Sequence, residues 1–338
     1  MATLLILVFL FTKGNGKKYL NNKSHSIVRS SYSLGTIINL KACGSNAEEA
    51  IEKSIKRLNN IDDKMSVFKE NSEISMINSK AGIESQIVGK DTYFVLKKSL
   101  EYSKILKGTF DPTIRPLVSL WNISGNGGRI PNEDEIKSKI KLVNYNDIIL
   151  DENSHSVMLK HKNQSLDVGG IAKGFAADEV RNIFYKYDIK SALIDLGGNI
   201  FALGLKEDGS NWKVGIQNPI KTRGEHIGLL NVKNKSVVTS GNYERYFMED
   251  GKKFHHIIDP KTGYPSESEI ISATIISDNS IDGDGLSTGI YILGINKAIS
   301  IIESMQGIDG ILVTADKKIY ITSGIKDDFI LTDNEFSI

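Results

Sequence analysis

Apolar residues recur with helical spacing in several stretches of the chain. The clearest lies between residues 47 and 58, where Ala47, Ala50, Ile51, Ile55 and Leu58 share one helical face. Capping residues and closing glycines mark the other stretches. The predicted helices span residues 47–58, 91–106, a short segment after Asn132 that has capping-box spacing to Glu135, 173–187, and 296–305 before Gly307.

Short apolar runs typical of strands dominate the second half of the chain. One strand is predicted early, over residues 33–42, and the others follow residue 190. The later predicted strands are 192–196, 213–217, 228–232, 269–276, 310–314 and 318–322. Strands that follow strands with few crossover helices favour an α+β fold, with a largely antiparallel sheet and flanking helices.

The N-terminus carries an unbroken apolar run, residues 4–11, followed by Lys13, Lys17 and Lys18. The run is too short to span a bilayer. We interpret residues 1–31 as a signal or anchor remnant with a tether, and residues 32–338 as one catalytic domain. The alternatives are a buried strand or an upstream start that is missing. We therefore expect an exported protein, tethered at the outer face of the cytoplasmic membrane.

Charge and cysteine content narrow the function classes. The 338 residues include 42 Lys or Arg and 41 Asp or Glu, for a net charge of +1. The basic residues are scattered among acidic ones, so nothing indicates a nucleic-acid partner. Cys43 is the one cysteine, which excludes an internal disulfide and a thiolate metal site. Its apolar surroundings predict a buried core position.

A glycine-rich segment precedes the predicted helix at residue 173. Within residues 166–174 lie Asp167, Gly169, Gly170, Lys173 and Gly174. Glycines let the backbone approach a ligand closely, helix-start amides face anions, and a lysine adds a point charge for phosphate. The alternative is a plain connection between a strand and a helix.

A second segment combines a carboxylate with hydroxyls. Asp284 and Thr288 are four residues apart, with Ser287 between them, and would share one face if a helix forms here. Oxygen ligands of this kind suit Mg²⁺, with phosphate and water completing the octahedron. The alternative is a helix cap made by Asp284 or Ser287.

A pair of histidines precedes a turn. His255 and His256 come just before Asp259-Pro260, and Thr262-Gly263 completes the turn. A histidine at this position can act as a general base or pair with a phosphate. The alternative is two exposed histidines on an edge strand.

Two further segments supply polar and aromatic groups. Residues 239–245 contain hydroxyls, Gly241 and Arg245, whereas residues 109–113 place Phe110 beside Asp111. Phe110 can lie against a flat ring, although a phenylalanine before a turn is more often part of the core.

Taken together, these motifs resemble those of the ApbE family of flavin transferases, the FAD:protein FMN transferases. The resemblance extends from about residue 33 to the C-terminus. The matching segments occur in the family's order: 34–36, 109–113, 166–174, 240–245, 256–263 and 283–288.

The resemblance implies a T-fold-related architecture and a defined reaction. Family members use Mg²⁺ to cleave FAD and pass FMN through a phosphoester bond to a Ser or Thr of a partner protein, releasing AMP. The partner would be a redox subunit or lipoprotein near the membrane. Two rivals remain, a pyrophosphatase that cuts FAD to FMN and AMP and a flavin-binding carrier without turnover.

The resemblance also implies residue roles. Catalysis would fall to His256 and Asp284. The metal would be held by Gly170 through its carbonyl, by Asp284 and Thr288, and by the neighbouring Ser287. The residues expected to bind FAD are Leu34, Thr109, Phe110, Asp111, Asp167, Lys173 and Ile258.

This chain departs from the family pattern at four positions. Leu34 stands where methionine is common, and Asn242 where aspartate is common. Gly283 and Gly285 flank Asp284, where alanines are frequent. We expect the last three changes to affect the rate, by weakening metal binding or loosening the loop, rather than the reaction type.

Overall fold

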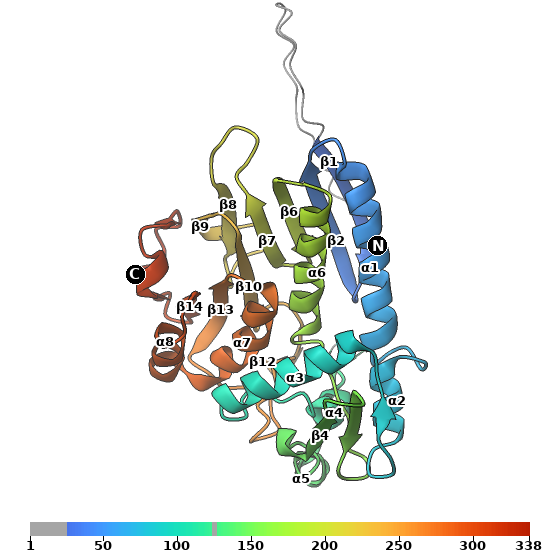
Figure 1. The fold of residues 1–338 in the computed structure, drawn as a ribbon. Coiled ribbons are helices and arrows are strands. Elements are labelled where there is room, and N and C mark those ends of the chain that lie inside the picture. The colour runs from blue at the N-terminus through green and yellow to red at the C-terminus, as the bar shows by residue number, and fades with distance from the viewer. Residues whose placement is uncertain (1–25, 124–126) are drawn as a thin grey trace, which may run out of the picture.

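An eight-stranded antiparallel sheet forms the centre of the protein (Figure 1). The structure is a computed structural model that describes residues 26–123 and 127–338. In spatial order the strands are β1 (Ser26–Ser33), β2 (Thr36–Cys43), β6 (Ser191–Leu196), β7 (Asn199–Gly204), β10 (Lys235–Gly241), β13 (Ile270–Ser277), β14 (Ile308–Thr314) and β15 (Ile319–Ile321). This sheet and the helices that cover it confirm the predicted α+β class.

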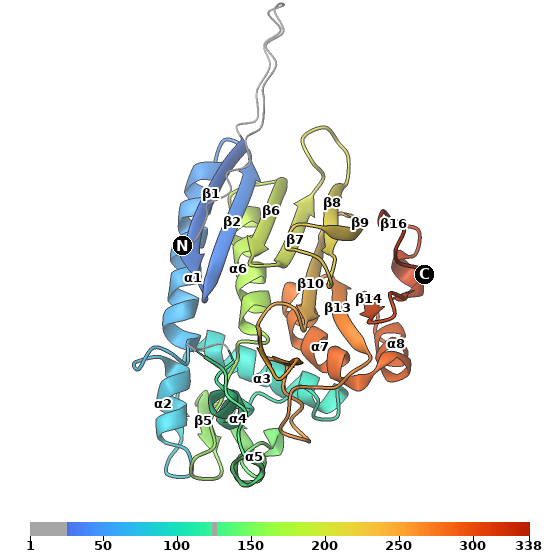
Figure 2. The same ribbon diagram turned by 180° about the vertical axis from the view of Figure 1, so that it is seen from behind.

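Helices cover one face of the sheet and a small sheet covers part of the other (Figure 2). The helical layer contains α1 (Ala47–Met65), α6 (Ala172–Lys186), α7 (Ser280–Leu293) and α8 (Ile295–Glu303). The small sheet has the order β16 (Phe329–Leu331), β9 (His226–Val232) and β8 (Trp212–Gln217). Each layer buries its own apolar cluster against the central sheet, so strands β7, β13 and β14 are apolar on both faces.

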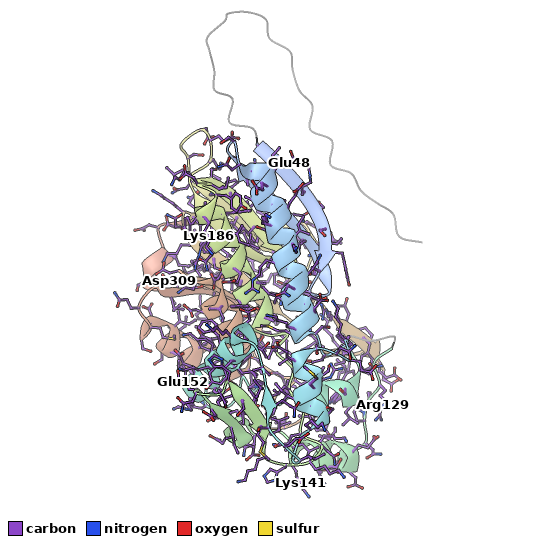
Figure 3. All side chains as sticks on the ribbon, turned by 45° about the vertical axis from the view of Figure 1, so that its right-hand side comes forward. Glu48, Arg129, Lys141, Glu152, Lys186 and Asp309 are labelled. Atoms are coloured by element: carbon purple, nitrogen blue, oxygen red, sulfur yellow. The ribbon has the colours of Figure 1, made fainter. Side chains whose placement is uncertain are left out.

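A third region lies beyond the C-terminal end of α1 and the N-terminal end of α6, at the bottom of Figure 1. It contains α2 (Glu73–Ser79), α3 (Lys90–Ile105), α4 (Arg115–Trp121), α5 (Glu133–Ile140), the strands β3 (Gln86–Ile87), β4 (Ile148–Asp151) and β5 (Ser156–Leu159), and the hairpin of β11 (Tyr246–Glu249) and β12 (Lys252–His255). Figure 3 shows Arg129 and Lys141 in this region and Glu48 at the opposite end of the molecule.

Most predicted elements are present, often longer than predicted. The capping box at Asn132 is complete, because the Asn132 side chain accepts from the Glu135 amide and the Glu135 carboxylate accepts from the Asn132 amide. Cys43 is buried, as expected. The apolar residues 4–11 and the lysines after them, predicted to be a signal or anchor remnant and tether, lie outside the described residues.

The start of the folded part differs from the prediction. Residues 26–31, expected to belong to the tether, form most of β1, and the predicted strand 33–42 contains the last residue of β1, a turn and most of β2. Its two-residue turn places Leu34 at φ 53° and Gly35 at φ 70°, as a type I′ turn requires. The edge strand β1 is rich in serine because only part of it is buried, and that polar composition obscured it.

The closest helix contact in the core is between α6 and α7. A methyl group on Gly174 of α6 would lie 2.4 Å from the Ser280 carbonyl oxygen and 2.7 Å from Cβ of Asp284. Asp178, one turn further along α6, accepts hydrogen bonds from the amides of Ser280 and Ile281 at the start of α7. Burial raises the pKa of Asp178 to about 6. Glycine at position 174 and a capping carboxylate therefore fix the two helices against each other.

Among the described residues, no helix is both long enough and apolar enough to cross a membrane.

We predict that Gly174→Ala lowers the free energy of unfolding by about 1–3 kcal/mol, because the added methyl forces α6 and α7 apart. Chemical denaturation measures the change. Asn182→Ala is the matched control, since Asn182 is exposed on the same helix. Equal denaturation midpoints for the two variants would show that the helices do not need this close approach.

Candidate functional site

A buried carboxylate on α7 meets the start of α6. Asp284 is 4% exposed, and its Oδ2 accepts a hydrogen bond of 2.8 Å from the backbone amide of Gly174. Its other oxygen, Oδ1, lies 3.6 Å from Nζ of Lys173. The carboxylate therefore lies at the positive end of α6. One carboxylate oxygen of Asp284 accepts from the Gly174 backbone, and the other faces the ammonium group of Lys173.

Hydroxyl groups line the helix turn that follows Asp284. Oγ of Ser240, near the end of β10, lies 2.8 Å from Oγ of Ser287 and 3.2 Å from Oγ1 of Thr288. Ser287 is buried and also donates to the Asp284 carbonyl oxygen, so its hydroxyl is already committed. Thr288 is only partly buried. A Cβ on Gly170 would lie 3.9 Å from the Thr288 hydroxyl, which places the Gly170 backbone beside Thr288.

The oxygen atoms of these neighbouring residues suit a hard divalent cation as ligands. Asp284, Thr288 and the Gly170 backbone provide a carboxylate, a hydroxyl and a carbonyl oxygen on neighbouring elements, and Mg²⁺ takes such ligands with water and phosphate. Within residues 26–123 and 127–338, no cluster of three or more His, Cys, Asp or Glu side chains could hold a metal. A cation here would therefore depend on one carboxylate and on oxygen atoms from its substrate.

The loop after α3 forms one wall of the site. Thr109 donates to the carbonyl oxygens of Leu106 and of Gly289 on α7. A Cβ on Gly170 would approach the Phe110 ring to 3.3 Å, so the ring contacts the glycine-rich segment directly. The predicted residues Thr109, Phe110 and Gly170 thus come together although about 60 residues separate them in the sequence.

Asp111 has a structural place within this loop. Its Oδ1 accepts from the amide and the hydroxyl of Thr113, and its Oδ2 accepts from the Tyr145 amide. Burial raises the pKa of Asp111, and these donors act in the opposite direction. Both oxygens of Asp111 hold the loop in shape, and its contact with a ligand remains a prediction.

An exposed aromatic ring extends this wall to the surface. Asp167 accepts from the Gly169 amide and lies 3.3 Å from the Arg115 guanidinium. The same guanidinium lies over the Phe68 ring, 5.0 Å from its centroid, yet Phe68 is 80% exposed. One ring face is covered by the cation and most of the ring is open to solvent, an arrangement that suits stacking with a planar ligand.

The two adjacent histidines have opposite environments. His255 is 5% exposed, and Nε2 lies 2.9 Å from the Ser266 carbonyl oxygen while Nδ1 accepts from the Ile257 amide. His256 is partly exposed, and its Nδ1 lies 3.2 Å from the Arg245 carbonyl oxygen. Because a carbonyl oxygen can only accept, Nδ1 of His256 carries the ring proton and Nε2 keeps its lone pair.

The protonation state of His256 suits a base. Burial lowers its pKa to about 4, and the positive charges of Arg245 and Lys173 contribute in the same direction. The ring is therefore neutral at physiological pH, with Nε2 available as a proton acceptor. Burial also lowers the pKa of His255, but both of its ring nitrogens are bound to the backbone.

Two of the predicted site residues belong to other surroundings. Leu34 lies in the β1–β2 turn and packs against the main core cluster, whereas Ile258 belongs to an apolar cluster with Trp121, Leu117 and Phe254. Trp121 donates to the Gly263 carbonyl oxygen and so anchors the turn that follows His256. The contacts of Leu34 and Ile258 with a ligand remain predictions.

The glycines beside Asp284 serve helix packing. The segment forms a helix, the condition under which Asp284 and Thr288 share one face: it lies inside α7, where a Cβ on Gly285 would meet the Tyr102 ring at 2.4 Å and one on Gly283 would meet Val238 at 3.0 Å. Tyr102 fills the space that an alanine at position 285 would need, and its hydroxyl donates to Asp282. The expected loosening of a loop at Gly283 and Gly285 is wrong for this reason.

Sequence reasoning missed Phe68, Arg115 and Ser240 as parts of the site. Ser240 lies within a motif that was recognised, whereas Phe68 and Arg115 lie outside every motif. An aromatic residue between polar neighbours, in Phe68-Lys69-Glu70-Asn71, is the one available signal for an exposed ring.

Comparison with known proteins finds relatives of this chain. The family model described as "ApbE family" matches residues 34–312. The FAD:protein FMN transferase of Klebsiella pneumoniae strain 342 is 34% identical over 305 residues, covering 90% of this chain and 94% of the relative. The FAD:protein FMN transferase of Treponema pallidum strain Nichols is 34% identical over 285 residues, covering 80% and 79%.

Solved structures agree with this result. The ApbE protein of Thermotoga maritima superposes with a TM-score of 0.84 at 30% identity, covering 90% of this chain and 99% of that one. The flavin transferase ApbE of Vibrio cholerae superposes with a TM-score of 0.82 at 25% identity, with the same coverage.

Proposed function

The chain belongs to the ApbE family, and from that premise we propose that it is a FAD:protein FMN transferase. It moves the FMN half of FAD to a Ser or Thr hydroxyl of an acceptor protein and releases AMP. The observation that carries the proposal is one site that combines a buried carboxylate, a lysine at a helix start and a neutral histidine. The names of its relatives support the same reaction.

The transfer step can be written with these groups. The acceptor oxygen bonds to the phosphorus on the FMN side of the pyrophosphate, and the bond from that phosphorus to the bridging oxygen breaks. Nε2 of His256 takes the hydroxyl proton, and AMP leaves with the bridging oxygen. FMN is then held by a phosphoester. A hydroxyl is a weak nucleophile at neutral pH, so a positioned base is needed.

The walls of the site suit FAD. Lys173, at the positive N-terminal end of α6, faces the phosphates, since helix N-termini and lysines bind such anions. Phe68, held from one side by Arg115, offers an open ring face to a flat heterocycle, and Phe110 lines the interior. Leu34, Thr109, Asp111, Asp167 and Ile258 complete the proposed FAD site.

We assign the cation as Mg²⁺, held by Asp284, Thr288 and the Gly170 carbonyl. When bound, it would neutralise charge on the pyrophosphate as the bridging oxygen leaves. Ser287 is the least suited of the proposed ligands, because its hydroxyl is bonded to Ser240 and to the Asp284 carbonyl. Its role is to hold the helix turn that carries Thr288.

The direct test is incubation with FAD, Mg²⁺ and a protein that carries an exposed Ser or Thr in a loop. The expected result is AMP release together with an acceptor heavier by one FMN group, measured by intact mass. AMP with free FMN and an unmodified acceptor would identify a pyrophosphatase instead. Bound FAD without any AMP would identify a carrier.

We predict that Asp284→Asn lowers Mg²⁺ affinity and transfer by about 10²-fold or more, because the cation loses its one ionised protein ligand. Asparagine can still accept from the Gly174 amide, so the fold should survive. Titration calorimetry with Mg²⁺ and the rate of AMP release measure the two effects. Asp278→Asn, at an exposed position just before α7, is the control. Full Mg²⁺ affinity in Asp284→Asn would refute the assignment.

For His256→Ala we predict a loss of transfer of about 10²–10⁴-fold while FAD binding remains, because the imidazole acts on the acceptor rather than on FAD. Flavin fluorescence measures binding, and intact mass of the acceptor measures transfer. His161→Ala, whose side chain is 54% exposed away from these motifs, is the control. Unchanged transfer in His256→Ala would mean that another group removes the proton.

We also propose that the protein is exported and works on acceptors at the outer face of the cytoplasmic membrane. The apolar residues 4–11 and the lysines after them support this placement. Cell fractionation with N-terminal sequencing tests it. Recovery in the cytosol with an intact N-terminus would refute export and leave the flavin chemistry unaffected.

A further inference from the structure

His255 joins the two arms of the loop that follows β12. Because the Ser266 carbonyl can only accept, Nε2 of His255 donates to it at 2.9 Å, and Nδ1 accepts from the Ile257 amide at 3.3 Å. The Ser266 amide in turn donates to the Ile257 carbonyl oxygen at 2.9 Å. The imidazole of His255 therefore fixes the backbone immediately after His256.

The same imidazole contacts the helix that carries the proposed cation ligands. The ring of Tyr291 lies edge-on to His255, with centroids 5.8 Å apart and an angle of 75° between the planes. Tyr291 is fully buried in α7, seven residues after Asp284 and three after Thr288. At 3.6 residues per turn, these three residues share one helical face.

The hydroxyl end of Tyr291 is near Asn242, which directly follows β10: burial raises the pKa of Tyr291, and the Asn242 side chain acts in the opposite direction. β10 also carries Ser240, the residue that contacts Thr288. Tyr291 thus lies beside the segment that borders the proposed cation site.

From these contacts we propose that His255 and Tyr291 act as a positioning pair, which sets the place of His256 relative to the face of α7 that bears Asp284 and Thr288. The inference rests on the proposed function because it takes His256 as the base. His255 is a positioning residue, since both of its ring nitrogens are used by the backbone.

An apolar side chain at position 255 could not hold the loop after β12 in the same place. A leucine at position 255 would leave the Ser266 carbonyl and the Ile257 amide without their His255 partners, and unpaired buried polar groups are unfavourable. The loop would move to regain them and carry His256 with it. A displacement of about 1 Å is enough to reduce a rate by 10²-fold.

The pair also controls the surroundings of His256. The groups that act on His256 are Arg245 on its own hairpin, His255 beside it and Lys173 from α6. Burial is the largest cause of its lowered pKa. Releasing the loop exposes the ring, so its pKa should rise toward the ordinary value of about 6.5.

The experiment compares His255→Leu, His255→Gln and Tyr291→Leu with wild type, well below their unfolding temperatures. Glutamine keeps a donor for Ser266, whereas leucine keeps none. NMR titration of His256 without FAD needs no turnover, and steady-state kinetics with FAD and an acceptor give kcat and KM. His226→Leu, at an exposed position on β9, is the control.

We expect His255→Leu and Tyr291→Leu to raise the pKa of His256 from about 4 toward 6.5. In both variants kcat should fall about 10- to 10²-fold while KM for FAD changes less than about twofold. His255→Gln should retain more of kcat than His255→Leu. If His255→Leu does not fold, Tyr291→Leu carries the test, because it removes the ring contact that places His255 and its loop against α7.

Two results would overturn the positioning pair. One is a wild-type pKa of His256 in both leucine variants, and the other is a kcat for His255→Gln no better than that for His255→Leu. Absence of FMN transfer by wild type would instead refute the proposed function, and the NMR titration would still decide whether the pair positions His256.

Discussion

The arrangement of the site depends on one buried carboxylate placed at the start of a helix. Asp284 lies inside the protein because the Gly174 amide and the positive end of α6 compensate for its loss of water. That contact requires α6 and α7 to approach more closely than any side chain at position 174 permits. Asp178 of α6 holds the same two helices together by accepting hydrogen bonds from the first amides of α7. Fold stability and placement of the reactive groups thus share one set of interactions.

Two neighbouring histidines show how environment divides the roles of identical side chains. His255 faces the core, and the backbone uses both of its ring nitrogens. His256 uses Nδ1 for a backbone carbonyl and leaves Nε2 free, while burial and nearby cations keep it neutral. A base must be neutral and unpaired at one nitrogen, and only the second histidine meets both conditions. The first histidine holds the loop in which the second is placed.

The sequence alone was enough for the α+β class, most elements and the segments that meet at the site, because these depend on local spacing and on ordered motifs.

The sequence was not enough where the position of a side chain depends on partners that are distant along the chain. Phe68 gains its place from Arg115 and Asp167, which lie far along the chain. Ser287 looked equivalent to Thr288 in the sequence, but in the structure its buried hydroxyl also donates to the Asp284 carbonyl oxygen. Gly285 looked like a loosened loop until the Tyr102 ring was found against it. The strand β1 was missed because an edge strand can be rich in polar residues.

The central claim is that the exposed side of Asp284 and the hydroxyl of Thr288 hold a divalent cation against the pyrophosphate of FAD. Crystals of the protein grown with FAD and Mn²⁺, measured for anomalous scattering, test this most directly. We predict a manganese peak bonded to Oδ1 of Asp284, Oγ1 of Thr288 and the Gly170 carbonyl oxygen, with the FAD phosphates on its open side. A peak that avoids Asp284, or FAD bound with its phosphates away from the start of α6, would contradict it.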